Sequence, residues 1–245
     1  MSIQKEWKII IIKQEIALSD KYKSYRKVII AMVIAINKLC MYTVDITSIF
    51  NWEALEMKFE KIEKVCPGKF ITRYDITYTT EDQKKKVYEM ISRNHDLHTQ
   101  GELQNPRVDG VVIIMHDEQN EKILLNREFR MAVGACIYNF PAGLVDEGEM
   151  PEVSAKRELK EETGLDLLQI RDTLYDSYSA IGFSNETNVV VIGTAGGNFA
   201  PSTSTLEEIE AGWYTRQEVR ELLKTERFAA RTQAYCYLWA KQEEK

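Results

Sequence analysis

The 245-residue chain contains few of the residues that mark several common protein classes. It has four cysteines, Cys40, Cys66, Cys136 and Cys236, and none of them forms a C-x-x-C pair. Zinc sites usually need such closely spaced ligands, so the sequence argues against a structural zinc centre. Cytosolic proteins keep their thiols reduced, and we therefore expect four buried, reduced cysteines in a cytoplasmic protein.

Runs of basic residues and long runs of apolar residues are also missing. Lys and Arg number 32 against 38 Asp and Glu, which gives a net charge of −6. Nucleic-acid-binding proteins usually carry a basic patch, so we expect no nucleic-acid partner. The apolar run Val28–Ile36 is too short to cross a bilayer, and we expect no membrane partner. An acidic protein that binds an anionic substrate needs a local cation, usually a divalent metal ion.

The chain divides into three parts by composition. Residues 1–56 form an N-terminal extension of unknown role, either a buried element or sequence upstream of a natural start at Met57. From Lys69 the pattern favours strands, because FITRYDITYTT alternates and KKVYEMISR is a suitable partner. We expect a β-rich subdomain over residues 57–100 and a second domain over residues 101–245.

Strands outnumber helices in the second domain and do not alternate regularly with them. This pattern favours an α/β fold of the α+β kind, with helices packed on a mixed sheet, over a doubly wound parallel sheet. The segments expected to be strands are 110–116, 122–130, 135–140, 174–181 and 188–195, and those expected to be helices are 151–163, 216–224 and 226–241.

The most informative stretch is GLVDEGEMPEVSAKRELKEETGL, residues 143–165. Pro151 suits the first turn of a helix, and Glu152 suits the positive end of the helix dipole. Gly164 suits the position just after a helix end. These signals predict a helix from Pro151 to Thr163, preceded by a loop.

On this helix Glu158, Glu161 and Glu162 are spaced i, i+3 and i+4 and share one face. Like charges at this spacing repel by a few tenths of a kcal/mol. A solvated face with interleaved Lys and Arg would leave the Glu158–Glu162 pair unexplained. A divalent cation explains the pair, because Mg²⁺ takes oxygen ligands and is usually held by a few carboxylates and substrate phosphates.

The spacing of these residues resembles the Nudix box, Gx5Ex7REUxEExGU, in which U is an aliphatic residue. The matching residues are Gly143, Glu149, Arg157, Glu158, Leu159, Glu161, Glu162, Gly164 and Leu165. The resemblance implies an α/β/α sandwich around a mixed sheet. It also implies hydrolysis of a nucleoside diphosphate linked to another group, in which metal ions neutralise phosphate charge and a carboxylate activates water.

The same resemblance implies roles for the box residues. Glu158 and Glu162 would be the main metal ligands, and Ala142 would give its backbone carbonyl to a metal. Glu161 would be a catalytic residue beside them. The expected cofactor is Mg²⁺, with Mn²⁺ as an alternative. Gly143 would lie against the substrate.

The resemblance also assigns a structural role within the box. Glu149 would pair with Arg157 and so brace the loop against the helix.

The segments around the box resemble the ADP-ribose pyrophosphatase branch of this family. REFR (127–130), FPAG (140–143) and GFSNE (182–186) have close counterparts there, and the resemblance covers about residues 57–240. In that branch the N-terminal sheet helps to build a dimer. We therefore expect a homodimer that binds a small nucleotide substrate.

Further site residues follow from their positions in this branch. Arg130 would contact the phosphate or the terminal ribose of the substrate, and Glu186 would line the site. Glu207 or Glu208 lies where the branch has a loop with a catalytic or metal-binding glutamate, and a solvated loop residue is the alternative. Tyr74 is a candidate for stacking on a base, with plain packing as the alternative.

Two residues depart from the branch. Asn139 stands where the branch often has Glu, and Ile181 stands where it tends to have Pro. Both changes leave hydrolysis intact but weaken the inference to ADP-ribose itself. The expected activity is hydrolysis of ADP-ribose or a related nucleoside diphosphate sugar. The alternatives are another nucleotide substrate and a non-catalytic sensing module, a class that typically loses the box glutamates.

Overall fold

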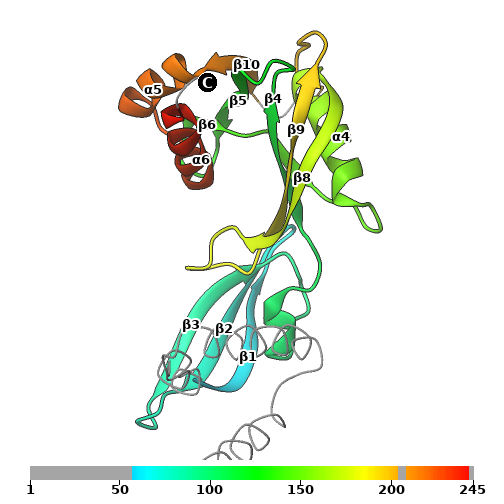
Figure 1. The fold of residues 1–245 in the computed structure, drawn as a ribbon. Coiled ribbons are helices and arrows are strands. Elements are labelled where there is room, and N and C mark those ends of the chain that lie inside the picture. The colour runs from blue at the N-terminus through cyan, green and yellow to red at the C-terminus, as the bar shows by residue number, and fades with distance from the viewer. Residues whose placement is uncertain (1–56, 204–207, 243–245) are drawn as a thin grey trace, which may run out of the picture. The chain divides into compact units, whose positions relative to one another are not determined.

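Two β-sheets carry the fold of the computed structural model, which describes residues 57–203 and 208–242 (Figure 1). The first sheet has three strands in the order β1-β2-β3, and the second has seven strands. The N-terminal extension, residues 1–56, lies outside the described residues. Its role and the predicted division at residue 100 stay predictions.

The small sheet is antiparallel throughout. It consists of β1 (Lys58–Pro67), β2 (Thr72–Thr79) and β3 (Lys85–Ser92). The strands predicted within FITRYDITYTT and KKVYEMISR are confirmed. The buried centre of this sheet contains Tyr74, Ile76, Met90 and Leu97.

The sequence does not predict β1, because the alternation of residues that is typical of a strand begins only at Lys69. Register shifts lie between Phe59 and Lys61 and between Lys64 and Cys66. Each shift inserts an extra residue, which moves the following side chains to the opposite face. Apolar and charged residues therefore do not alternate along the printed sequence, although the segment is a strand.

Tyr74 is a core residue of the small sheet. Its side chain has no exposed surface. The hydroxyl donates to the carbonyl oxygen of Asn94 at 2.9 Å and accepts from the N–H of Leu97 at 3.3 Å. The stacking role considered for Tyr74 is therefore wrong, because a fully buried ring offers no face to a ligand.

The seven-stranded sheet is mixed. Its main path runs β10-β5-β4-β9-β8, with β6 paired to β5 and β7 paired to β4. β4 and β9 are parallel, and the other pairs are antiparallel. The strands are β4 (Gly110–His116), β5 (Lys122–Arg130), β6 (Ala135–Asn139), β7 (Ala142–Leu144), β8 (Asp166–Tyr178), β9 (Thr187–Gly196) and β10 (Ile209–Thr215).

Several of these bounds agree with the sequence analysis. The strands at 110–116 and 122–130 are confirmed with the same ends. A strand was expected at 174–181, but β8 begins already at Asp166, shortly after the acidic helix, and ends at Tyr178. Most of β8 is exposed, because it is an edge strand, and its apolar pattern is correspondingly weak.

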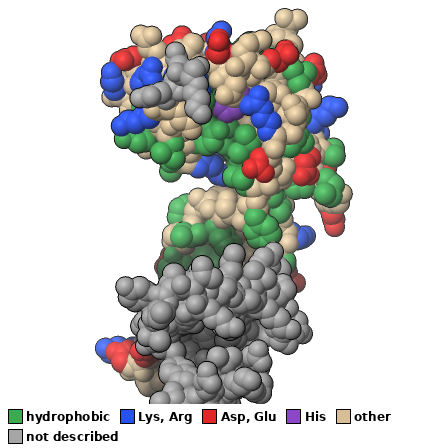
Figure 2. Space-filling view, in the orientation of Figure 1, with side chains coloured by type: hydrophobic (Ala, Val, Ile, Leu, Met, Phe, Trp, Pro, Cys, Tyr) green, Lys and Arg blue, Asp and Glu red, His purple; other side chains and the backbone are tan. Residues whose placement is uncertain are grey.

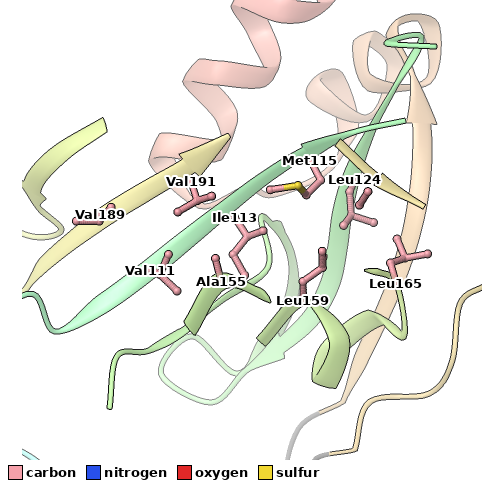
Figure 3. Close-up of a cluster of buried hydrophobic side chains, with 10 residues drawn as sticks. Val111, Ile113, Met115, Leu124, Ala155, Leu159, Leu165, Val189 and Val191 are labelled. Carbon is pink, nitrogen blue, oxygen red and sulfur yellow. The ribbon is translucent and has the colours of Figure 1, made fainter. Parts of the chain in front are cut away.

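The residues of β4 alternate between the two faces of the large sheet. Val111, Ile113 and Met115 lie on one face and pack with Ala155 and Leu159 of α4 (Pro151–Thr163) (Figure 3). These side chains are fully buried. Helix α4 therefore supplies the apolar cover of this face.

The opposite face of the sheet packs against two C-terminal helices. Val112 and Ile114 of β4 lie in a cluster with Val219 of α5 (Arg216–Thr225) and Trp239 of α6 (Ala230–Lys241). With α4 on the other face, this arrangement confirms the predicted α/β/α sandwich around a mixed sheet (Figure 1). In the described ranges no helix is long and apolar enough to cross a membrane.

The start of α6 differs from the predicted residue 226. The N–H of Tyr138 donates to Arg227 and the carbonyl of Tyr138 accepts from Ala229, at 2.8 and 3.0 Å. The backbone of residues 227–229 is therefore used by β6, and the helix begins only at Ala230.

The expectation of four buried cysteines is wrong for two of them. Cys66 and Cys136 are exposed, whereas Cys236 is buried in α6 and burial raises the pKa of its thiol to about 12. Cys66 lies on the exposed strand β1 and Cys136 on the short strand β6, which neither helix layer covers at that position. Cys40 lies outside the described residues.

The face shown in Figure 2 carries Lys and Arg side chains mixed with Asp and Glu side chains over its upper part. This mixture agrees with the balanced charge of the sequence.

Strands β6 and β7 place the P-A-G segment inside the large sheet. β4 pairs with β5 at His116–Ile123 and with β7 over Gly110–Val112. The N–H of Ile113 also donates to the carbonyl of Pro141 at 2.8 Å. Residues 141–143 are thus fixed beside β4, and α4 packs on β7. This packing brings the first glycine of the acidic stretch to the helix that carries the glutamates.

Candidate active site

The helix with the acidic residues begins and ends where the sequence predicts. Pro151 occupies its first position, after an extended Met150. Gly164 ends the helix with φ of 79°, and its N–H donates to the carbonyl of Lys160. A Cβ on Gly164 would lie 2.4 Å from the backbone nitrogen of Ala200. Both the left-handed backbone and this close neighbour therefore require glycine.

Glu149 and Arg157 join the preceding loop to α4. Arg157 Nη2 lies 3.0 Å from Glu149 Oε2 and donates to the carbonyl of Leu144 at 3.1 Å. The Ser154 hydroxyl donates to Glu149 Oε2 at 2.6 Å. Arg157 and, to a smaller degree, Ser154 lower the pKa of Glu149 to about 2. The ionised carboxylate therefore fixes the loop against the first turns of the helix.

Arg157 also contacts the other acids of its helix. Its Nη1 donates to Glu158 Oε1 at 2.7 Å and lies 3.6 Å from Glu161 Oε2. The planar guanidinium has five N–H donors, so one side chain can hold several carboxylates. We call Glu149, Arg157, Glu158 and Glu161 the arginine cluster. The central cation offsets part of the like-charge repulsion along α4.

Glu158 lies against the backbone of Gly143. A Cβ on Gly143 would be 1.9 Å from Cδ and 2.2 Å from Oε1 of Glu158. The backbone of Gly143 does not adopt a positive φ, and Gly143, which lies in β7, pairs with Val111 of β4. Glycine is therefore needed at this position for space and not for backbone freedom. Ala142, the preceding residue, pairs with Val112.

Glu162 lies one turn further along α4 and is 8% exposed. Its Oε2 accepts a hydrogen bond of 2.7 Å from Nδ2 of Asn126, which is fully buried in β5. The sequence analysis missed Asn126. The available signal was a polar residue two positions after Leu124, on the same face of the strand, because Leu124 packs in the core beneath α4.

The acids of α4 have the chemistry that a hard divalent cation requires. Glu158 and Glu162 offer carboxylate oxygens one helical turn apart, and the missing Cβ of Gly143 provides the space that the Glu158 carboxylate occupies. Within residues 57–203 and 208–242, no group of three or more Asp, Glu, His or Cys side chains is already arranged to hold a metal ion. Arg157 donates to Glu158, and Asn126 donates to Glu162. The donor set fits a cation whose remaining ligands are a backbone carbonyl, substrate phosphates and water.

Arg130 lies at the end of β5 with its side chain 56% exposed, and Nη1 is 3.7 Å from Glu128 Oε1. Glu128 is buried and accepts from Asn139 Nδ2 at 2.9 Å, while Asn139 Oδ1 accepts from the Thr232 hydroxyl at 2.9 Å. An exposed guanidinium is thus held beside a buried carboxylate. The sequence analysis singled out Arg130 and Asn139 but missed Glu128 and Thr232, which lie far apart in the chain.

Glu186 has its ion-pair partner in the small sheet. Its Oε2 lies 2.7 Å from Nε of Arg93, just after β3. Burial lowers the pKa of Arg231 on α6, and the charge of Glu186 partly opposes that shift. The structure therefore places Glu186 beside two arginines and gives it no described hydrogen bond to α4.

Described residues on either side of Glu207 contact α4 and β5. At one end, the N–H of Thr203 donates to the carbonyl of Glu161 at 2.9 Å. At the other end, the carbonyl of Glu208 accepts from Phe129 at 3.1 Å. Glu208 is exposed. Glu207 lies outside the described residues, so its role stays a prediction.

Comparisons with known proteins agree with this geometry. The NUDIX domain matches residues 106–236, which is more than half of the chain and contains the whole acidic stretch. The chain belongs to the Nudix family. Its Nudix box therefore comprises the loop from Gly143, helix α4 and the residues that end the helix.

The relatives of this Nudix chain include named pyrophosphatases. The ADP-sugar pyrophosphatase of Mus musculus is 30% identical over 102 residues, which cover 42% of this chain and 45% of the relative. The ADP-ribose pyrophosphatase of Mycobacterium tuberculosis is 34% identical over 121 residues, which cover 48% and 58%. The expected resemblance to the ADP-ribose pyrophosphatase branch is confirmed. The matches span about half the length of these relatives.

A solved structure supports the fold independently. The crystal structure of an ADP compounds hydrolase aligns with a TM-score of 0.57 at 16% identity, and covers 76% of this chain and 94% of the other. At this identity the likeness concerns the fold alone.

Proposed function

We propose that this Nudix protein is a metal-dependent pyrophosphohydrolase of ADP-ribose or a related nucleoside diphosphate sugar. The observation that carries the proposal is the placement of Glu158 against Gly143 by Arg157, with Glu162 one turn away. A solvated charged face would not bury Glu162 or need glycine beside Glu158. Relatives named ADP-sugar and ADP-ribose pyrophosphatase support the substrate class.

Mg²⁺ is the proposed cofactor, with Mn²⁺ as the alternative. Glu158, Glu162 and the backbone carbonyl of Ala142 would hold it. When bound, it would neutralise charge on the diphosphate and lower the pKa of a water molecule. Arg157 keeps Glu158 in position before the metal arrives, and the missing Cβ of Gly143 provides the space that the Glu158 carboxylate occupies.

The reaction adds water across one P–O–P linkage. The water oxygen bonds to one phosphorus atom, the bridging P–O bond breaks, and two monophosphates result. A carboxylate must accept the proton of the water. Glu161 is the candidate on α4, because its side chain is half-exposed and its contact with Arg157 is loose, with 3.6 Å between Oε2 and Nη1. Glu208, whose carbonyl accepts from the N–H of Phe129, and Glu207 are further candidates.

Substrate recognition is proposed for residues outside the box. The exposed guanidinium of Arg130 can form charge-assisted hydrogen bonds with a phosphate. Glu186 would line the site next to Arg93. The loop before Glu186 borders a pocket of about 220 Å³ that includes Tyr78 and Tyr88. The rings of Tyr78 and Tyr88 line this pocket, and they suit stacking on a nucleobase better than the buried ring of Tyr74 does.

We further propose a cytoplasmic homodimer that acts on small nucleotides. The support for the dimer is the small N-terminal sheet, which the ADP-ribose pyrophosphatase branch uses to build its dimer. The support for the location is the absence of cysteine pairing among Cys66, Cys136 and Cys236, which are free thiols.

A different nucleoside diphosphate sugar is the second candidate substrate. Asn139, one of the two residues that depart from the branch, donates to Glu128 and accepts from Thr232. Another relative, the GDP-mannose pyrophosphatase of Shigella flexneri, is 27% identical over 126 residues. A sensing module without catalysis is disfavoured because every box glutamate is retained.

The test is a product assay with purified protein, Mg²⁺ and a panel of ADP-ribose, GDP-mannose, a nucleoside triphosphate and a dinucleoside polyphosphate. We expect ADP-ribose to give AMP and ribose phosphate, and Glu162→Gln to give neither. Rapid cleavage of the triphosphate or the dinucleoside polyphosphate alone would overturn the substrate class and leave the family assignment intact. Cleavage by wild-type protein in excess chelator would overturn the metal dependence.

A further inference from the structure

Asn126 is a buried polar residue that the proposed reaction does not yet use. It lies in β5 with no exposed surface and pairs with Asn139 of β6 and Ala211 of β10. Its Nδ2 donates to Glu162 Oε2 at 2.7 Å. Its Oδ1 is also buried, and within the described residues it has no hydrogen-bond partner.

This arrangement is unfavourable as a purely structural device. An isolated buried acceptor loses its hydrogen bonds to water and gains none from the protein. A leucine has the same number and branching of side-chain heavy atoms, contains no polar atom, and would avoid that cost. An amide at this position therefore needs a reason beyond packing.

The reason that fits is the state of Glu162. A hydrogen-bond donor on Oε2 restricts rotation of the carboxylate and so fixes the direction in which its lone pairs point. Partners of this kind behind a metal ligand orient it and raise its affinity for the metal. The unpartnered Oδ1 suits a water molecule, because Mg²⁺ usually keeps several waters.

We propose that Asn126 is a positioning residue that holds the Glu162 carboxylate ready for a divalent cation. The inference rests on the proposed metal use of Glu162. It adds a residue on β5 to a site otherwise built from the Nudix box and its loop. Asn126 acts through Glu162 and does not touch the substrate.

The decisive variant is Asn126→Leu, which removes the donor and the unpartnered acceptor and keeps the branched shape of the side chain. We expect Mn²⁺, titrated alone and followed by the electron paramagnetic resonance of the free ion, to bind about 10- to 100-fold more weakly. The melting temperature without metal should hold or rise. Hydrolysis should need more Mg²⁺ for half-saturation, and the maximal rate should be largely recovered at high Mg²⁺.

A matched control lies on the same helix. The Thr163 hydroxyl is buried, donates to Leu159 and accepts from Leu165, at 2.6 and 3.1 Å. Thr163→Val should lower the melting temperature and leave Mn²⁺ affinity unchanged. If Asn126→Leu does not fold, Asn126→Ser replaces it, because the shorter hydroxyl side chain cannot span the distance to Glu162.

The outcomes separate this inference from the proposed function. Unchanged Mn²⁺ affinity in the Asn126 variants, with tight binding by wild type, would overturn the role of Asn126 alone. The role of Asn126 would also be overturned if the Asn126 variants and Thr163→Val lost Mn²⁺ affinity and melting temperature to the same extent. Failure of wild type to bind Mn²⁺, with Glu162→Gln behaving identically, would overturn the metal assignment itself.

Discussion

Replacing Gly143 by alanine tests the site at its tightest point. The added Cβ would lie 1.9 Å from Glu158 Cδ, whereas ordinary van der Waals contact begins near 3.4 Å. The carboxyl group must therefore retreat by about 1.5 Å. Misplacement of a reacting group by about 1 Å can cost on the order of 100-fold in rate. We expect Gly143→Ala to lose activity by that factor or more at saturating Mg²⁺ and substrate.

Stability should change little in the same variant. The clashing atoms belong to the far end of a flexible side chain, which can rotate away without moving the backbone. Gly143 has no positive φ, so alanine is sterically allowed and reduces the entropy of the unfolded chain by roughly 0.4–1 kcal/mol. The free energy of unfolding should therefore stay within about 1 kcal/mol of wild type.

Gly148→Ala provides the opposite control. Gly148 has φ of 79° but no atom within 4 Å of an added Cβ. The left-handed backbone should cost an alanine about 1–2 kcal/mol of stability without moving Glu158. We expect a lower melting temperature and near wild-type turnover.

A second-site variant sharpens the interpretation. Glu158→Asp shortens the side chain by one methylene group, which is close to the distance by which the carboxyl must retreat. The double variant Gly143→Ala with Glu158→Asp should be no slower than the slower single variant, because both changes act on one contact. Full activity of folded Gly143→Ala, or additive losses in the double variant, would refute the argument that Gly143 serves Glu158.

Three further predictions concern other parts of the molecule. Glu162→Gln should lose at least about 100-fold in activity but keep its stability without metal, since repulsion along α4 falls; turnover at saturating Mg²⁺ decides this. Burial, aided by Arg171, lowers the pKa of His116 from 6.5 to about 4. The unfolded chain therefore binds this proton first, and the free energy of unfolding should fall by up to about 3 kcal/mol from pH 6.5 to 4. In His116→Gln, the denaturation midpoint should therefore depend less on pH between pH 6.5 and 4. Removing residues 1–56 should leave an active enzyme, because β1 begins only at Lys58; an insoluble product would contradict this.

Local signals were sufficient for the element that carries the site. Pro151 and Gly164 set the ends of α4, because one fixes a helical φ and the other adopts a left-handed one. The strands at 110–116 and 122–130 follow from apolar runs bounded by turn residues. Each of these signals depends only on neighbouring residues, so no knowledge of the tertiary fold is needed.

The contacts that position the glutamates could not be predicted in the same way. Asn126 and Glu162 are 36 residues apart and meet only because β5 lies beneath α4. The bulges in β1 break the alternation of residues by which a strand is predicted. The pairing of residues 227–229 with β6 moves the start of α6 to Ala230. In each case the sequence shows suitable residue types, but the geometry depends on which strands become neighbours.

Asn139, which stands where the branch often has Glu, is best understood together with its hydrogen-bond partner Glu128. Asn139 donates to Glu128 at 2.9 Å and accepts from Thr232 at 2.9 Å, so its amide uses both of its polar atoms. A glutamate at 139 would place a second carboxylate beside Glu128, which is only 8% exposed. Two carboxylates at such a distance cannot both ionise without a shared proton or a cation between them. Asn139 therefore removes a repulsion that Glu128 would otherwise create. Because Arg130 lies 3.7 Å from the same Glu128 oxygen, this exchange bears on the substrate contact proposed for Arg130 and leaves the acids of α4 unchanged.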